Sequence, residues 1–150
     1  MKVLLDTNLL VLLVIGRTDP AAITKHKRSR QFTEDDLGLL DRLLAGFNAV
    51  VVTPNIATEA SNLLVQSGGL EHEPFLRMLK VLFEAGLIER YVETVRAAAL
   101  AEYERLGVAD CATICEAGAV DHVITADLGL YLALAARGYP VVNFNHVRVL

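Results

Sequence analysis

Short runs of β-branched and other apolar residues alternate along the chain with longer segments whose apolar residues recur at helical spacing. The short runs predict strands near 2–6, 49–53, 88–92, 121–125 and 140–143. The longer segments predict helices near 8–15, 34–45, 55–66, 74–85, 94–106, 109–118 and 128–137. Strands that alternate with helices are typical of a parallel sheet covered on both faces. We therefore predict an α/β fold, a three-layer α/β/α sandwich with a central parallel five-stranded sheet.

One segment interrupts this alternation. The stretch "GRTDPAAITKHKRSRQF" at 16–32 has no clear period and contains five basic residues. We interpret it as a basic loop within one domain that spans residues 1–150, because the chain shows no internal repeat and no second change of composition.

The composition supports a single packed domain. Hydrophobic residues make up 53% of the 150 residues and charged residues 21%, which is enough apolar material for one core. No apolar stretch reaches the roughly 18 residues of a membrane span, and no cleavable signal begins the chain. We expect a cytoplasmic protein without membrane contact. The apolar content exceeds the usual 45–50%, which is consistent with a homodimer.

The net charge, the cysteines and the histidines argue against several classes of function. A net charge of −4 argues against a protein that coats nucleic acid through bulk electrostatics. Cys111 and Cys115 lie four apart in a predicted helix, a spacing that favours buried small hydrophobic residues over a disulfide or a zinc site. The four histidines are scattered along the chain, so we assign them no catalytic role.

An aspartate lies in the middle of the first apolar run, "VLLDTNLL" at 3–10. A carboxylate buried without a partner is costly, so Asp6 requires either a hydrogen-bonding role or a cation. Asp6 ends the first predicted strand, and Asp127 follows the fourth, in "HVITAD". In a doubly wound parallel sheet both positions lie at the same edge, where such folds bind ligands.

Two further acids are predicted to point towards this edge. Glu59 lies in "TPNIATEASNLL", where its spacing from Ile56 and Leu63 predicts that it shares their inward helix face. Asp110 lies near the start of a short helix in "GVADCATICEAGA". Each acid alone also has a structural explanation, since Asp and Glu commonly cap helices, favour helix N-termini or occupy solvated faces.

Four carboxylates in one crevice would repel one another unless a cation lay between them. Oxygen donors without a convergent His or Cys set favour Mg²⁺ or Mn²⁺ over zinc or iron. Such ions activate an attacking water and stabilise the leaving oxygen of a phosphodiester. The sequence therefore predicts phosphodiester hydrolysis.

Four fragments, in this order along the chain, resemble PIN-domain ribonucleases of the kind typified by VapC toxins. They are "LLDTN", "TPNIATEASNLL", "GVADCATI" and "VITADLGL", and an Asn-Phe pair follows in "VVNFNH". The resemblance implies an RNA substrate, an antitoxin that covers the site, and four catalytic acids, Asp6, Glu59, Asp110 and Asp127. It also implies that Asp6, Asp110 and Asp127 bind Mg²⁺ or Mn²⁺ and that Asn8 and Thr125 hold acids and waters in place. Asn8, Thr7 and Thr125 are equally explained as ordinary helix caps.

The basic loop at 16–32 is longer than the connection usual in compact toxins of this family. Two interpretations of its cations remain open. They bind RNA phosphates at the mouth of the acidic site, or they belong to a solvated mobile loop. The cations concerned are Lys25, Lys27, Arg28 and Arg30.

Two alternative functions follow from the same acids. One is a non-catalytic regulatory module whose acidic pocket binds a metal and a partner, although "YPVVNFNHVRVL" lacks the lysine that a receiver-like module would place there. The less favoured one is a phosphatase with Asp6 as nucleophile, because "DTN" offers no second aspartate two positions on.

Overall fold

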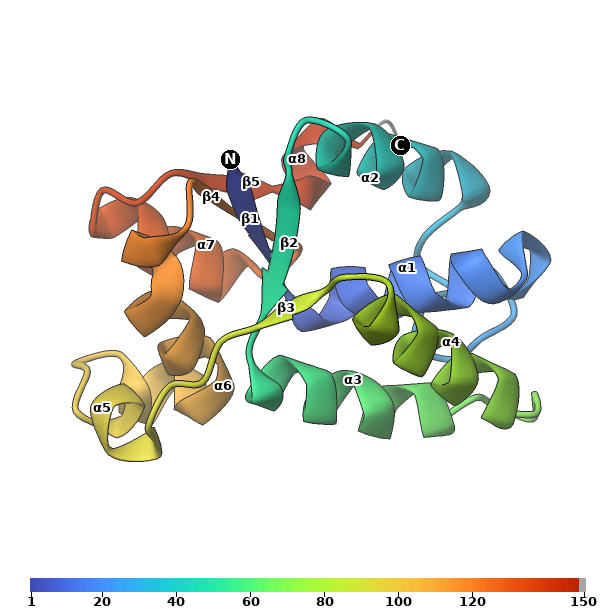
Figure 1. Cartoon of the computed structure of the whole chain (residues 1–150), viewed down its shortest axis with the longest axis horizontal. Helices are drawn as coiled ribbons and strands as arrows, with labels where there is room; N and C mark the ends of the chain where they lie inside the picture. The colour runs from blue at the N-terminus through green and yellow to red at the C-terminus, as the bar shows by residue number, and fades with distance from the viewer. Residues whose placement is uncertain (149–150) are drawn as a thin grey trace.

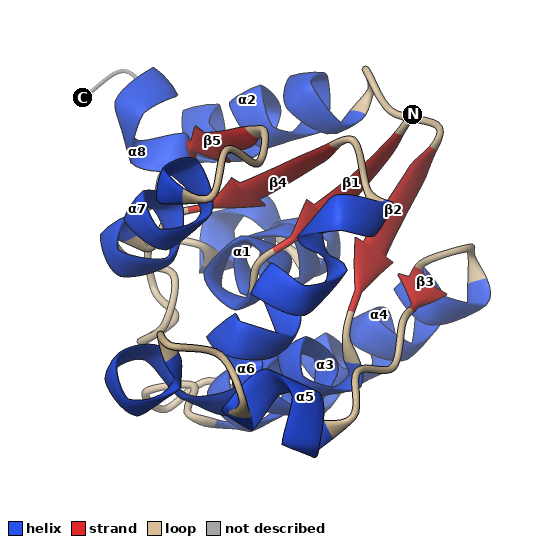
Figure 2. Cartoon of the chain, turned by 90° about the vertical axis from the view of Figure 1, so that its left-hand side faces the viewer, coloured by secondary structure: helices blue, strands red, loops and turns tan. Residues whose placement is uncertain are grey.

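The computed structural model describes residues 1–148 and contains one parallel sheet in the strand order β3-β2-β1-β4-β5. All four pairings between neighbouring strands are parallel, with Val3 opposite Val50 on one side of β1 and Leu4 opposite Val123 on the other. The predicted five-stranded parallel sheet is thus confirmed (Figure 2). Its strands are β1 (Lys2–Leu5), β2 (Ala49–Val52), β3 (Ile88–Glu89), β4 (His122–Thr125) and β5 (Val141–Asn143).

Helices cover both faces of the sheet, which confirms the three-layer architecture. Figure 1 shows α1, α2 and α4 on one side of the strands and α6 and α7 on the other. The helices are α1 (Thr7–Thr18), α2 (Glu34–Leu44), α3 (Pro54–Val65), α4 (Glu73–Glu84), α5 (Thr94–Ala98), α6 (Tyr103–Glu116), α7 (Leu128–Ala136) and α8 (Phe144–Val147), with 3₁₀ turns at Pro20–Ala22 and Ala117–Ala119.

Helix α1 is the central helix of the core. Every residue from 9 to 15 is apolar and at most 3% exposed, and α2, α3 and α4 all pack against the helix. A helix that is apolar on every side is stable only when neighbours surround it. Even so, within residues 1–148 no helix is long and apolar enough to cross a bilayer. Asp6 lies between the end of β1 and the buried start of α1.

The predicted helix at 94–106 is wrong in one respect, because it is divided into α5 and the beginning of α6. A second break lies within α6, where Gly107 has φ +84° and ψ −179°. Glycine tolerates a positive φ that a side chain would make costly. The helix therefore starts again at Val108, which places Asp110 in the first turn of the second segment.

The segment 16–32 is packed against the domain. Ile23, His26, Ser29 and Phe32 are at most 1% exposed. His26 Nε2 lies 3.0 Å from the carbonyl oxygen of Leu64 and donates to it, while His26 Nδ1 accepts from the backbone N–H of Arg28 at 3.0 Å. Both ring nitrogens are thus paired in the neutral ring. The interpretation of this segment as a solvated loop is wrong for these residues, although Lys25, Lys27 and Arg30 are exposed.

Candidate acidic site at the strand ends

The site lies where the order of the strands reverses. The chain places β2 and β3 on one side of β1 and then returns to place β4 and β5 on the other side. Parallel sheets of this kind bind ligands in the crevice beyond the carboxyl ends of the two strands at the reversal. Asp6 directly follows β1, and Asp127 lies two residues beyond β4. The two acids therefore lie at the edge of the sheet where such folds bind ligands.

Asp6 is 6% exposed and accepts two hydrogen bonds. Its Oδ1 accepts the Thr7 backbone N–H at 2.8 Å, so Asp6 is the N-cap of α1, and its Oδ2 accepts the Thr125 hydroxyl at 2.6 Å. Each carboxylate oxygen has a second lone pair, so these bonds leave both oxygens able to bind a further group. Burial raises the pKa of Asp6 above its ordinary value, the two hydrogen bonds oppose that rise, and the charges of Asp127 and Glu59 add to it.

Thr125 connects the two acids that follow the strands. Its buried hydroxyl donates to Asp6 and accepts the backbone N–H of Asp127 at 3.0 Å. Asp127 is exposed, and its Oδ1 accepts the backbone N–H of Leu130 at 2.9 Å, which makes it the N-cap of α7. One hydroxyl thus fixes the relative position of the residues that follow the neighbouring strands β1 and β4.

Glu59 reaches the site from the second turn of α3. Its Oε2 accepts the Thr7 hydroxyl at 3.2 Å, which links α3 to the start of α1. Contrary to the prediction of an inward position, Glu59 is exposed while its helix neighbour Ile56 is 1% exposed. Sequence reasoning also missed the contact made by Thr7, whose only signal was its position directly after Asp6. Asn8 is half-buried in the first turn of α1.

Asp110 is half-buried near the start of the second segment of α6. Burial raises its pKa to about 7, and the charges of Asp6, Asp127 and Glu59 each contribute to the rise. The four predicted acids are therefore close enough for their charges to act on one another. They come from two strand ends and two helices that are far apart in the sequence.

The donor set fits a hydrated hard cation better than a tightly enclosed ion. Within the described residues, no three His, Cys, Asp or Glu side chains form a group that could hold a metal ion between them. Zinc sites need such convergence, with three or four protein ligands. Mg²⁺ retains several waters and uses one or two carboxylates directly, so Mg²⁺ or Mn²⁺ would need fewer converging side chains than zinc does. Burial is the main cause of the raised pKa of Asp110, and the three neighbouring carboxylates add to it.

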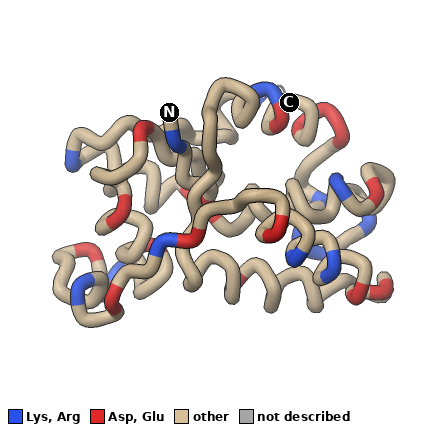
Figure 3. The backbone as a smooth tube through the Cα atoms, viewed as in Figure 1, with Lys and Arg blue, Asp and Glu red and all other residues tan. Residues whose placement is uncertain are grey.

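The predicted RNA-binding cations lie elsewhere. The loop that contains Lys25, Lys27, Arg28 and Arg30 follows the C-terminal end of α1, about 17 Å of helix from Asp6. Arg28 is hydrogen-bonded to Gln66, the residue that ends α3. Figure 3 shows basic residues gathered at this end of the molecule. The structure therefore does not bring these cations to the strand ends, because α1 and α3 extend between the two regions.

No family model, curated protein or solved structure matches the chain at a significant level. The function must therefore be inferred from the fold, from the acids at the strand ends and from the sequence fragments.

Proposed function

We propose that the protein is a Mg²⁺- or Mn²⁺-dependent endoribonuclease of the PIN-domain type that hydrolyses RNA phosphodiester bonds at the acidic site. The observation that supports this most strongly is the gathering of Asp6, Glu59, Asp110 and Asp127 from separate elements at the strand ends, where the charges of the other three add to the burial that raises the pKa of Asp110. Perturbed carboxylates at the reversal point of a parallel sheet are typical of a functional site. The fragments that resemble PIN-domain ribonucleases support RNA as the substrate.

The residues have distinct roles in this proposal. Asp6, Asp110 and Asp127 hold the ion, in part through water, and Glu59 completes the negative crevice. A bound ion would supply Lewis-acid stabilisation and would lower the pKa of an attacking water. Thr125 orients Asp6 and the Asp127 backbone, and Thr7 orients Glu59. Such hydroxyl contacts keep acids in one geometry before substrate binds.

The same resemblance suggests a toxin that an antitoxin holds inactive, and the high apolar content suggests a homodimer. An exposed apolar surface on α7 supports a protein partner close to the site. Leu128 and Leu132 are 56% and 55% exposed, and Leu128 directly follows Asp127. A partner that covered these residues would lie next to Asp127.

A non-catalytic regulatory module remains the second candidate. The observation that favours it is that both oxygens of Asp6 and one oxygen of Asp127 already accept hydrogen bonds that cap helices or join strands. A module of this kind would bind the metal without cutting RNA.

The test is a cleavage assay on end-labelled single-stranded RNA with Mg²⁺, Mn²⁺ or excess EDTA. We expect metal-dependent cleavage by the wild type and at least a hundredfold loss in Asp6→Asn. The control Asp35→Asn, which neutralises an exposed acid in the first turn of α2, should cleave as the wild type does. Cleavage that persists unchanged in Asp6→Asn would refute the proposed site, and metal binding without cleavage would favour the regulatory module.

A further inference from the structure

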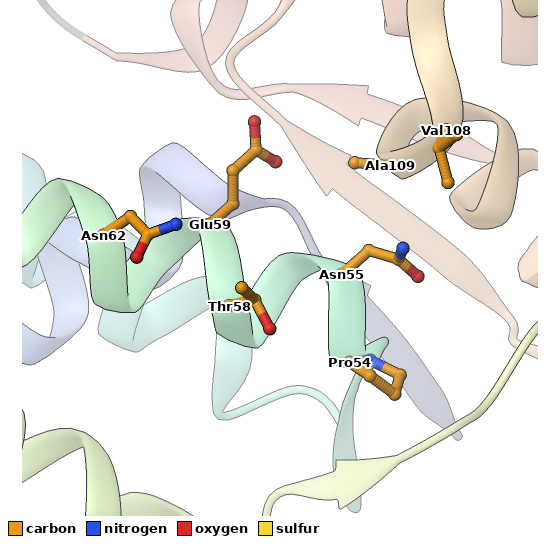
Figure 4. Close-up of a pocket in the computed structure, with 7 residues that line it drawn as sticks. All are labelled: Pro54, Asn55, Thr58, Glu59, Asn62, Val108 and Ala109. Carbon is orange, nitrogen blue, oxygen red and sulfur yellow. The ribbon is translucent and has the colours of Figure 1, made fainter.

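A groove of about 340 Å³ lies beside Glu59, between α3 and the second segment of α6. From α3 it is lined by Asn55, Thr58 and Asn62, whose spacing of three and four residues places them on one side of the helix. Val108 and Ala109 line the opposite wall, and Figure 4 shows Asn55 and Val108 across the groove from each other. Glu59 lines this groove and also accepts a hydrogen bond from Thr7, next to Asp6.

The groove is therefore continuous with the candidate active site. Glu59 is held by the Thr7 hydroxyl at the start of α1, one residue from Asp6. Ala109, on the other wall, immediately precedes Asp110. An RNA strand whose cleaved phosphate lay beside the four acids would place the next nucleotide in the groove between α3 and α6.

The lining favours an uncharged group with hydrogen-bonding edges. All the residues that line the groove lie in the described part of the chain, and none of them is Lys or Arg. A phosphate there would meet the Glu59 carboxylate without a compensating cation. Asn55 and Asn62 each offer amide donors and an acceptor, the combination that recognises base edges. Pro54 and Val108 add apolar surface against which a flat ring can lie.

The size of the groove also limits its occupant. A volume of about 340 Å³ is at the lower end of the range for small-molecule sites. It has room for one nucleoside. Proteins read RNA sequence mainly through unpaired bases that are turned out of the stack and contacted on their edges.

We propose that this groove binds the unpaired base of the RNA nucleotide next to the cleaved phosphate, and that Asn55 and Asn62 determine which base is preferred. The inference rests on the proposed ribonuclease function. Asn55 and Asn62 act as specificity-determining residues, since they contact the base and not the reacting phosphate.

The experiment compares short single-stranded RNAs that differ only in the base on one side of the cleaved bond, each carrying A, C, G or U. For the wild type we expect a clear order of kcat/KM among the four. In Asn55→Ala and Asn62→Ala the ratio between the best and worst base should fall about tenfold, mainly through KM, because a lost amide contact removes base discrimination. Cleavage should still require the metal.

The control is Gln66→Ala, which removes an amide side chain next to the C-terminal end of α3. That amide contacts Arg28 and does not line the groove. An unchanged base preference in both Asn variants, or an equal change in Gln66→Ala, would overturn the inference.

Binding separates failure of this inference from failure of the proposed function. Fluorescence anisotropy of the same labelled RNAs is measured in EDTA with the Asp6→Asn protein, which cannot cleave if the proposed function is correct. Base preference in binding that disappears in Asn55→Ala supports the groove even if no cleavage is ever seen. Binding without base preference, or no binding, overturns the groove whether or not the wild type cleaves RNA.

Discussion

Neutralising Asp110 should stabilise the metal-free protein at neutral and alkaline pH, which is the opposite of the usual effect of changing a partly buried residue. Asp110→Asn keeps the size and shape of the side chain and removes its charge. In the wild type that charge is half-buried, and the negative charges of Asp6, Asp127 and Glu59 repel it. The substitution removes this repulsion and the cost of burying an ionised group.

The magnitude follows from the pKa of Asp110, which is raised from 3.8 to about 7. One pH unit corresponds to 1.36 kcal/mol, so the ionised carboxylate costs the fold up to about 4 kcal/mol above pH 7. Between about pH 4 and 7 the folded state retains a proton that the unfolded state has lost. The free energy of unfolding therefore falls as pH rises through this window. Below about pH 4 Asp110 is protonated in both the folded and the unfolded state, so the cost of burying its charge is absent and the protein is most stable with respect to this group.

The assay is thermal unfolding in EDTA from pH 4 to 8.5 for the wild type, Asp110→Asn and the control Asp35→Asn. For a chain of this length, about 4 kcal/mol corresponds to a rise in Tm of about 10 °C. We expect the Tm of Asp110→Asn to exceed that of the wild type by about this amount at pH 8, and by little at pH 4. Mg²⁺ or Mn²⁺ should raise the Tm of the wild type more than that of the variant. A difference in Tm that does not depend on pH, or a less stable variant at pH 8, would refute the reasoning.

Three other substitutions test single contacts. Thr125→Val should lower the free energy of unfolding by about 1–3 kcal/mol in urea denaturation, because Asp6 loses its buried hydroxyl donor; an unchanged urea midpoint would contradict this. His26→Ala should cost about 2–4 kcal/mol by the same method through two lost hydrogen bonds and lost packing. Because burial lowers the pKa of His26, the wild type should also lose stability as pH falls below 6.5, and a variant with the same pH dependence would count against this role. Glu102→Gln should remove at most about 1 kcal/mol of stability, since Glu102 forms a two-bond ion pair with Arg137 near the surface. Arg137 lowers the pKa of Glu102 to about 2, so this contribution is present above pH 4.5 and is lost as pH falls towards 2, and urea midpoints that differ equally at pH 7 and pH 2 would contradict it.

The strands and the position of the acids could be predicted because both depend on local patterns and on one topological rule. Each predicted strand overlaps the observed one, since short apolar runs between turn residues leave few alternatives. Once the strands are parallel, a residue that follows β1 and a residue that follows β4 must lie at the same edge. This is why Asp6 and Asp127 could be placed together without knowledge of any contact.

The contacts between elements could not be predicted in the same way. The hydrogen bond from Thr7 to Glu59 joins residues 52 positions apart and depends on how α1 packs on α3. In the segment 16–32, two of the buried residues are the polar His26 and Ser29, so the apolar residues Ile23 and Phe32 alone do not form a hydrophobic period. Helix α8 has only four residues, which is too short for a helical period to be visible.

Three of the four acids stand at the beginning of a helical segment, so capping and cation binding are not competing explanations for them. Asp6 and Asp127 cap α1 and α7, because each accepts a hydrogen bond from a backbone N–H in the first turn of its helix. A substitution at either position therefore removes a cap and a candidate ligand together, and its effect on stability cannot separate the two. The perturbation of Asp110 comes from burial and from the other carboxylates, so its neutralisation is expected to stabilise the fold while weakening the response to metal. A functional site often retains a charge that lowers the stability of the metal-free protein. If Asp110→Asn raises the Tm in EDTA but reduces the rise in Tm that metal produces, Asp110 is a metal ligand and not a helix cap.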